Sequence, residues 1–450
     1  MKILSITAGA GGMYCGSCLR DNAIASELVA RGHDVTLLPL YTPLRTDEPN
    51  VSRSTVLFGG ISVYLQQHSK LFRRTPRFID RLLDSPRLIS AFADRSVSTD
   101  PRLLGELTIS MLEGTSGVLR KEFDKLLDWL SGEPRPDVVN ITNSMLIGLA
   151  RPLREALGRP ICCTLQGEDL FLEGLIEPYK SRAVALIRRQ VHDVDRFVAV
   201  SEYYASFMAA YLQVPADRMS VVPIGINMAG FERGKTSTDD IFRIGYFARI
   251  APEKGLHILA AAFQRFRQRV DGRAKLEIGG YLAASHKEYL AGIQRSLERE
   301  GLSGDVAYRG EVDRAGKIAF LRELDVLSVP ATYDEPKGVF LLESMACGVP
   351  VVQPRRGAFT EVVEKTGGGL LVRADDVESL AEGLHTLWRD RTLRDELGRR
   401  GHEGVRAHYT IQMSVDRLTD VFEAVSESAE HHARVVSGTP LTPVVQVSER

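Results

Sequence analysis

The stretch "VPATYDEPKGVFLLESMACGVPVVQP", residues 329–354, predicts a parallel α/β unit with a ligand site at its centre. An apolar strand leads into a loop with Glu335, a helix begins near Gly338 and carries Glu343, and "PVVQP" returns to the sheet. Loops at the carboxyl ends of parallel strands line ligand crevices, and a helix N-terminus favours phosphate. The stretch therefore indicates an anion site between two carboxylates. The alternative is that Glu343 only caps the helix and Glu335 is a solvated loop residue.

Apolar strands of the same kind recur on both sides of this stretch and alternate with helical segments. Those upstream of residue 228 are "KILSITA", "DVTLLPLY", "PDVVNIT", "RPICCTL", "DRFVAVS" and "MSVVPIG". Those downstream of residue 240 are "FRIGYFA", "AKLEIGG", "VAYRG", "DVLSVP", "PVVQP" and "GGLLV". Such continuous strands predict parallel sheets that helices cover on both faces. We therefore expect an α/β chain of two doubly wound, Rossmann-like domains.

The polar stretch "MAGFERGKTSTDD" near residues 228–240 marks the boundary between these domains. The last twenty residues lack periodicity and predict a loose tail. The helix before that tail is a candidate for crossing back to the N-terminal domain. The expected parts are an N-terminal domain 1–228 with a mostly helical insertion at about 45–131, a linker 229–240, a C-terminal domain 241–410, a helix 411–430 and a tail 431–450.

The composition excludes some classes of protein. Lys and Arg number 57 against 58 Asp and Glu, so the net charge is -1 and nucleic acid is not an expected partner. No stretch approaches the roughly 18 apolar residues that a membrane-spanning helix needs. The five cysteines are a sparse, odd set, which fits reduced thiols better than a disulfide framework. We therefore expect a cytoplasmic protein.

A basic segment in the insertion, "SKLFRRTPRFIDRLL" at 69–83, mixes arginines with apolar residues. Such a segment either lies on an anionic membrane or an acceptor, or forms a solvated helical face. The first alternative would place the protein at the inner face of the membrane.

A second motif, "FARIAPEKGLHIL" at 247–259, places two cations just after the first strand of the C-terminal domain. The guanidinium of Arg249 and the ammonium of Lys254 are five residues apart, at the expected upper edge of the sheet. Such a pair can clamp a diphosphate. The alternative is that both form surface salt bridges, which are common.

Together, "ARIAPEKG" and "EPKGVFLLESMACGVPVV" closely resemble the retaining glycosyltransferases of family 4, which have the GT-B fold. "GAGGM" with "ASELVARGHDV" resembles that family's N-terminal glycine loop and first helix, so the resemblance spans the chain. It implies two domains that face each other across a cleft. It also implies metal-independent transfer of a sugar, with retention, from a nucleotide-diphosphate donor to a hydroxyl of a glycan, lipid or small molecule. No further cofactor is implied.

The resemblance also implies roles for individual residues. Glu335 positions the donor sugar, Glu343 binds the nucleotide ribose, and Arg249 and Lys254 neutralise the departing diphosphate. The remaining residues expected on the donor side are Gly11, Gly12, Lys337, Gly338 and Val339. Gly280, which closes the strand "AKLEIGG", either approaches the nucleoside or forms a tight turn. Those expected near the acceptor or the donor sugar are Gln166, Glu168 and Asn143.

Two positions depart from the family pattern. Lys337 stands where an aromatic residue is usual, and it either meets an acidic sugar or a phosphate or points into solvent. Gln166 stands where a histidine is frequent, and its amide forms hydrogen bonds but does not titrate. Beside it, Glu168 either contacts the acceptor or is an acidic cap of a helix. These departures leave two alternatives open: a non-catalytic module that binds sugar nucleotides or glycans, and a nucleotide-sugar epimerase.

The cysteines Cys15 and Cys18 form a Cys-x-x-Cys pair where the first strand meets the first helix. A redox pair suits such a junction, but so does a phosphate site in the glycine loop just before it. Our interpretation is that the glycines are functional and that the two cysteines are small packing residues. Cys162 and Cys163 end another strand at the same edge, but adjacent cysteines chelate one ion poorly, which disfavours a four-thiol metal site.

Overall fold

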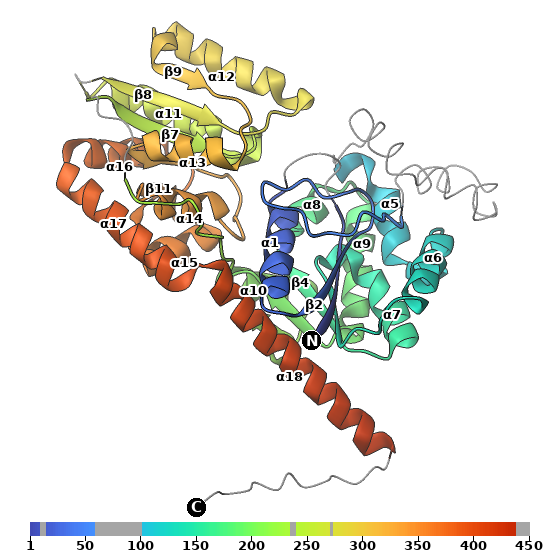
Figure 1. Cartoon of the computed structure of the whole chain (residues 1–450). Helices are drawn as coiled ribbons and strands as arrows, with labels where there is room; N and C mark the ends of the chain where they lie inside the picture. Colours follow the sequence, from blue (N-terminus) through green and yellow to red (C-terminus); the bar gives the residue numbers. More distant parts are fainter. Residues whose placement is uncertain (10–14, 59–100, 235–239, 271–272, 438–450) are drawn as a thin grey trace, which may run out of the picture.

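The computed structural model describes residues 1–9, 15–58, 101–234, 240–270 and 273–437, which form two α/β halves (Figure 1). Each half is built on a sheet of six parallel strands. The predicted fold class, two doubly wound Rossmann-like domains, is therefore confirmed. Gly11 and Gly12, the basic segment 69–83 and the last thirteen residues lie outside the described residues.

The N-terminal half has the strand order β2-β1-β3-β4-β5-β6. All six strands lie where the sequence predicts them. They are β1 (Lys2–Thr7), β2 (Asp34–Pro39), β3 (Val138–Ile141), β4 (Ile161–Leu165), β5 (Arg196–Ala199) and β6 (Met219–Val221). The helices are α1 (Gly16–Ala30), α5 (Gly105–Leu112), α6 (Arg120–Ser131), α7 (Ala150–Leu157), α8 (Asp169–Gly174), α9 (Tyr179–Gln190) and α10 (Glu202–Leu212). Within the expected insertion, α5 and α6 are helical, whereas residues 45–58 form no helix or strand.

The C-terminal half has the strand order β12-β11-β10-β7-β8-β9. Its strands are β7 (Phe242–Phe247), β8 (Ala274–Gly279), β9 (Val306–Tyr308), β10 (Val326–Leu327), β11 (Val351–Pro354) and β12 (Gly369–Val372). Its helices are α11 (Leu256–Arg267), α12 (Lys287–Arg299), α13 (Arg314–Glu323), α14 (Val339–Ala346), α15 (Gly357–Thr366), α16 (Val377–Arg389) and α17 (Arg391–His408). The strands after β7 are added on one side of it as far as β9 and then, from β10, on its other side, so the strand order reverses between β7 and β10. Ligands of such sheets bind beyond the carboxyl ends of the strands at this switch point.

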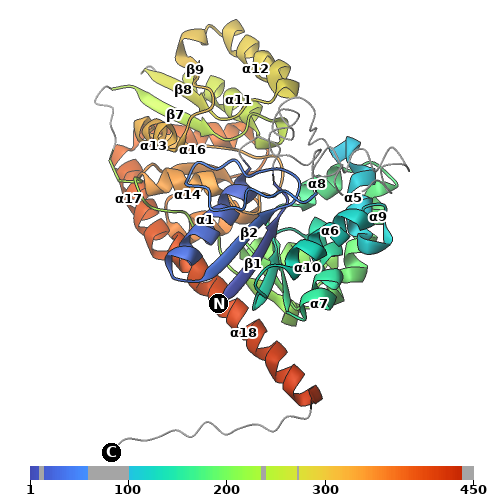
Figure 2. The same cartoon turned by 45° about the vertical axis from the view of Figure 1, so that its right-hand side comes forward.

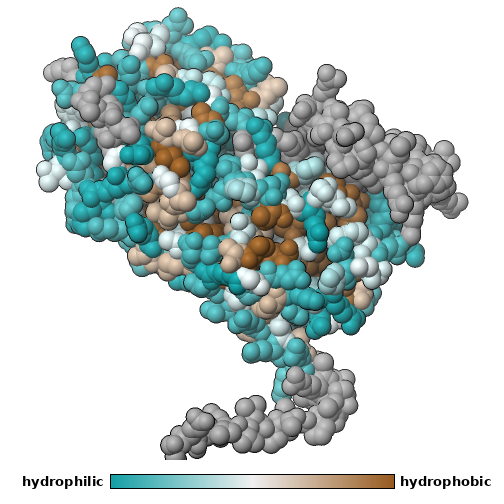
Figure 3. Space-filling model, viewed as in Figure 1, coloured by the Kyte–Doolittle hydropathy of each residue, from teal (hydrophilic) through white to brown (hydrophobic). Residues whose placement is uncertain are grey.

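The central strands form here because most of their side chains are apolar and buried on both faces of the sheet, whereas the edge strands β6, β9 and β12 are only half-buried. In β1, Ile3, Leu4 and Ile6 are all buried, and β4 is buried along its whole length. The surface in Figure 3 is correspondingly mostly hydrophilic, with apolar residues gathered in a few places. Polar caps begin several helices; the side chain of Asp313, for example, accepts a hydrogen bond from the Gly316 backbone N–H at the start of α13.

The last described helix, α18 (Ile411–Ser437), leaves the C-terminal half and runs along the N-terminal half (Figures 1 and 2). Its apolar side chains recur every three or four residues and pack against β1, β3 and α1; they are Ile411, Val415, Leu418, Phe422 and Val425. The helix continues to Ser437, so the prediction that residues 431–437 belong to a loose tail is wrong. Residues 431–437, "HHARVVS", contain no glycine or proline that would end the helix.

Candidate active site

The two candidate motifs of the C-terminal half meet at its switch point. Lys254 ends a short 3-10 turn after β7, and Glu335 lies in the loop after β10. The Lys254 Nζ lies 2.5 Å from the Glu335 Oε2, and their side chains are only 14% and 6% exposed. The structure therefore joins a cation and a carboxylate that lie 81 positions apart in the sequence.

A tyrosine completes this buried pair. The hydroxyl of Tyr333 donates a hydrogen bond to Glu335 Oε2 and accepts one from Lys254 Nζ at 2.6 Å. Burial opposes the charge of Glu335, but Lys254 and Tyr333 outweigh it and hold the pKa of the carboxyl below its ordinary value. Glu335 is thus a buried carboxylate, and the alternative of a solvated loop residue is wrong.

Arg249 lies on the same loop after β7, but another carboxylate holds it in this structure. Its Nη2 lies 2.5 Å from Glu253 Oε1, and its side chain is 36% exposed. This is the geometry of the surface salt bridge that the sequence left open. The diphosphate clamp remains a prediction for Arg249, and a ligand there would replace or share its contact with Glu253.

Glu343 lies on α14 and is not a cap of that helix. Its Oε1 accepts a hydrogen bond from Lys317 Nζ at 2.5 Å, and the same ammonium lies 2.9 Å from Asp47 Oδ2 in the N-terminal half. Burial lowers the pKa of Lys317, but the charges of Glu343 and Asp47 outweigh that effect and raise it. Lys317 therefore links the candidate ribose-binding carboxylate to the opposite half of the molecule.

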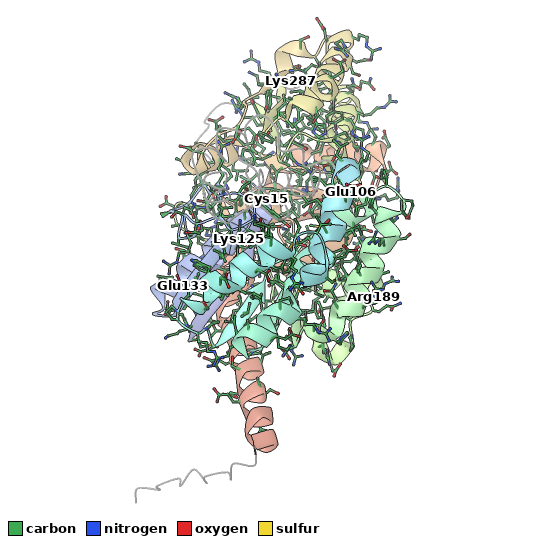
Figure 4. The ribbon with its side chains drawn as sticks, turned by 90° about the vertical axis from the view of Figure 1, so that its right-hand side faces the viewer. Cys15, Glu106, Lys125, Glu133, Arg189 and Lys287 are labelled. Atoms are coloured by element: carbon green, nitrogen blue, oxygen red, sulfur yellow. The ribbon has the colours of Figure 1, made fainter. Side chains whose placement is uncertain are left out.

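The loop that carries Lys337 reaches across to the N-terminal half. Lys337 is buried, and its Nζ donates to Ser17 Oγ at 2.9 Å in the first turn of α1. One residue earlier, the carbonyl of Pro336 accepts a hydrogen bond from Ser201 Oγ. The alternative that Lys337 points into solvent is therefore wrong. Figure 4 places Cys15, at the start of α1, at the level where the two halves meet.

The loop after Lys337 leads into the predicted helix. Gly338 precedes α14 with a φ of 70°, a conformation that favours glycine, and Val339 is the first residue of the helix. Gly280, after β8, has a φ of 129°, and a Cβ there would lie 1.9 Å from the Ala248 carbonyl oxygen. A close backbone approach thus explains Gly280, and the donor contacts of these three residues remain predictions.

Gln166 lies at the end of β4, on the N-terminal side of the interface. Its Nε2 donates to the Thr142 carbonyl at 2.8 Å and lies 3.2 Å from Asp21 Oδ1. Its Oε1 is buried and has no hydrogen-bond partner among the described residues.

Glu168 has a different role from the predicted helix cap. Its carboxylate accepts hydrogen bonds from the backbone N–H groups of Ser144, Gln166 and Gly167, and it makes no capping bond to α8. It therefore holds the loops after β3 and β4 together, and the cap prediction is wrong. Asn143 caps a 3-10 turn, because its side chain accepts a hydrogen bond from Met145 N at 2.8 Å. Acceptor contacts by Glu168 and Asn143 remain predictions.

The two cysteines of the Cys-x-x-Cys pair differ in environment. Cys18 packs with Ala25, Leu37 and Leu44, as expected of a packing residue. The pKa of Cys15 is lowered to about 5, because the Cys18 thiol hydrogen-bonds to it and Lys337 lies nearby, although burial opposes the shift.

In the part of the chain that the structure describes, no group of three or more His, Cys, Asp or Glu side chains is placed to hold a metal ion. None of the described helices is long and apolar enough to cross a membrane.

Known proteins similar to this chain have enzymatic functions in sugar transfer. Residues 22–225 match the family described as Glycosyl transferase 4-like domain, and residues 231–404 match Glycosyl transferases group 1. A phosphatidyl-myo-inositol mannosyltransferase of Mycobacterium leprae is 29% identical over 57% of this chain and 63% of its own length. A D-inositol 3-phosphate glycosyltransferase of Pseudarthrobacter chlorophenolicus is 27% identical over 76% of this chain and 84% of its own. The chain spans less than two thirds of the first curated relatives that it matches.

Solved structures similar to this one share its architecture at low identity. Sucrose-phosphate synthase from Thermosynechococcus elongatus superposes with a TM-score of 0.67 at 15% identity, over 98% of this chain and 100% of that chain. Anabaena HepE in complex with UDP and glucose gives 0.64 at 18% identity, over 94% of this chain and 100% of that chain. The two motifs, the paired sheets and the matches over both halves agree, and the chain belongs to the family 4 glycosyltransferases and has the GT-B fold.

Proposed function

We propose that this chain transfers a sugar, with retention of configuration, from a nucleotide-diphosphate donor to a hydroxyl group of an acceptor. The observation that carries the proposal is the buried Lys254–Glu335 pair at the carboxyl ends of β7 and β10. A sheet of this topology binds ligands at that edge, and the Lys337–Ser17 contact brings the N-terminal half over it.

The charges of the site match the needs of this reaction. As the acceptor oxygen bonds to the anomeric carbon, the bond to the diphosphate breaks, and the leaving group takes the electron pair and then the acceptor's proton. Arg249, Lys254 and the N-terminus of α14 supply positive charge for that leaving group, so the proposal needs no divalent ion. Glu335 would orient the donor sugar, and Glu343, held by Lys317, would accept hydrogen bonds from the ribose. Closure of the two halves would exclude water and limit hydrolysis.

The proposal also includes the class of acceptor and the cellular location. Relatives named for phosphatidyl-myo-inositol and D-inositol 3-phosphate suggest an acceptor with a polyol hydroxyl, although their identity to this chain is low. The five cysteines are free thiols, which fits the cytoplasm. Contact with the inner face of a membrane through residues 69–83 remains a prediction.

Nucleotide binding and turnover test this function. We expect UDP, GDP or ADP to raise the melting temperature of the protein, and a nucleotide sugar to release its diphosphate only with an acceptor present. Glu335→Ala and Arg249→Ala should abolish transfer while the fold survives. Arg355→Ala is the matched control, because Arg355 forms an exposed ion pair with Glu364 in the same half.

Four outcomes would contradict the proposal. One is no melting shift with any of these nucleotides, and another is near-normal turnover in either site variant. Nucleotide binding without diphosphate release across a broad acceptor panel would favour a binding module. An altered sugar released without any acceptor would favour an epimerase.

A further inference from the structure

Arg20 is a buried cation that the proposed reaction does not use. It lies near the start of α1 and is 5% exposed, and its Nη1 lies 3.3 Å from Asp21 Oδ1. Its Nε and Nη2 are buried and have no hydrogen-bond partner among the described residues. These two nitrogens lie on the same edge of the guanidinium, which is the fork that grips a carboxylate or phosphate with two parallel hydrogen bonds.

A buried guanidinium fork without hydrogen-bond acceptors is energetically unfavourable. Each buried donor without a partner costs about 1–3 kcal/mol. Burial lowers the pKa of Arg20, but a guanidinium remains charged at any ordinary pH. The ion pair with Asp21 engages Nη1 only, so an oxyanion in the fork would supply the acceptors that Nε and Nη2 lack.

A buried acceptor that lacks a donor lies close to this fork. Gln166 Oε1 is a buried acceptor without a partner, and its orientation is fixed because the Nε2 donates to the Thr142 carbonyl. Gln166 Nε2 and Arg20 Nη1 both lie within hydrogen-bond distance of Asp21 Oδ1. The unpartnered atoms therefore lie close enough together for one small molecule to meet them. That molecule would present an anionic group to Arg20 and a hydroxyl to Gln166.

The fork lies on the opposite side of the interface from the cations proposed for the donor diphosphate. Arg249 and Lys254 belong to the C-terminal half, whereas Arg20 and Gln166 belong to the N-terminal half. Burial lowers the pKa of Lys337, and the charge of nearby Arg20 acts in the same direction. Because Lys337 contacts Ser17, the C-terminal half covers the start of α1, so separation of the halves would admit a ligand to the fork.

We propose that Arg20 and Gln166 form a subsite for a phosphate or carboxylate group on a hydroxyl-bearing substrate. The inference rests on the proposed transferase function and narrows its substrate class to an anionic sugar or polyol. The anionic group is carried either by the acceptor or by the transferred sugar, and the experiment has one arm for each source.

Calorimetric titration of the whole chain compares charged and uncharged partners. In the acceptor arm, with a saturating nucleoside diphosphate, the probes are myo-inositol 1-phosphate against myo-inositol and glucuronate against glucose. In the donor arm, the probes are UDP-glucuronate against UDP-glucose. We expect the anionic probe to bind at least about tenfold more tightly in one arm, the factor that one charge-assisted hydrogen bond contributes.

Three variants assign that preference to the fork. Arg20→Gln should abolish it and leave the Kd for the nucleoside diphosphate unchanged, whereas Arg31→Gln, at the far end of the same helix, should change neither. Arg20→Lys keeps the charge without the fork and should show an intermediate loss, so it also serves if Arg20→Gln fails to fold.

The inference is overturned if no anionic probe is preferred in either arm, or if both Arg20 variants keep the wild-type preference. It is also overturned if the Arg20 variants mainly weaken nucleotide binding, which would assign the fork to the donor diphosphate. Failure of the wild-type chain to bind any nucleotide would instead refute the proposed function.

Discussion

Variants of the buried Lys254–Glu335 pair should separate its contribution to stability from its contribution to turnover. In Lys254→Met, Glu335 would remain buried with the Tyr333 hydroxyl but without its cation. Breaking a buried ion pair in this way costs about 3–5 kcal/mol. At about 2–4 °C per kcal/mol for a domain of this size, we expect the melting temperature of the C-terminal half to fall by about 10 °C.

The double variant Lys254→Met/Glu335→Gln removes both charges and leaves an amide oxygen for the Tyr333 hydroxyl. It should recover most of the lost stability, to within about 1–2 kcal/mol of the wild type, because replacing both partners avoids a buried lone charge. It should not recover turnover, since removing one preorganised electrostatic group typically lowers kcat by about 10²–10³.

Scanning calorimetry and turnover measurements on the two single variants and the double variant provide the test. The control is the same cycle at Arg355 and Glu364, an exposed pair that should be worth less than about 1 kcal/mol. A double variant no more stable than Lys254→Met, or one with restored turnover, would refute the reasoning.

Three further perturbations follow from the structure. Burial raises the pKa of Asp169 to about 6, so the folded state takes up a proton more readily than the unfolded state. The wild type should therefore gain stability relative to Asp169→Asn as the pH falls from 7 to 5, and equal melting profiles over that range would contradict this. Gly255→Ala should lower the unfolding free energy in urea by about 1–3 kcal/mol, because φ is 72° and a Cβ would lie 1.8 Å from the Pro330 carbonyl oxygen; an unchanged midpoint would contradict this. At pH 7, iodoacetamide should modify Cys15 before Cys162 or Cys163, whose pKa values burial raises; mass spectrometry reads the order.

The fold was predictable because each strand is a short apolar run with a helix after it, so local patterns determine both sheets. The Lys254–Glu335 contact was predictable for a related reason. Both residues directly follow strands, and the carboxyl ends of parallel strands share one edge of the sheet. No comparable rule predicts that Lys337 crosses to Ser17, because that contact depends on how the two halves meet.

The residues that the sequence did not reveal act through contacts between distant segments. Lys317 has the same local signal as any lysine on a solvated helical face, and only the fold brings it to Glu343 and Asp47. Arg20 likewise resembles a surface residue of an amphipathic helix. The position of Glu168 just before α8 made a helix cap one of its two predicted roles, but backbone N–H groups after β3 and β4 bind its carboxylate instead.

A crystal structure of the chain with bound UDP or GDP examines the proposed charge arrangement itself. We expect the terminal phosphate to lie between the two halves, within hydrogen-bond distance of Lys254 and Arg249, with the Arg249–Glu253 ion pair broken or shared. A nucleotide bound elsewhere, or one whose phosphates contact neither cation while Arg249 stays paired with Glu253, would contradict the assignment of this site.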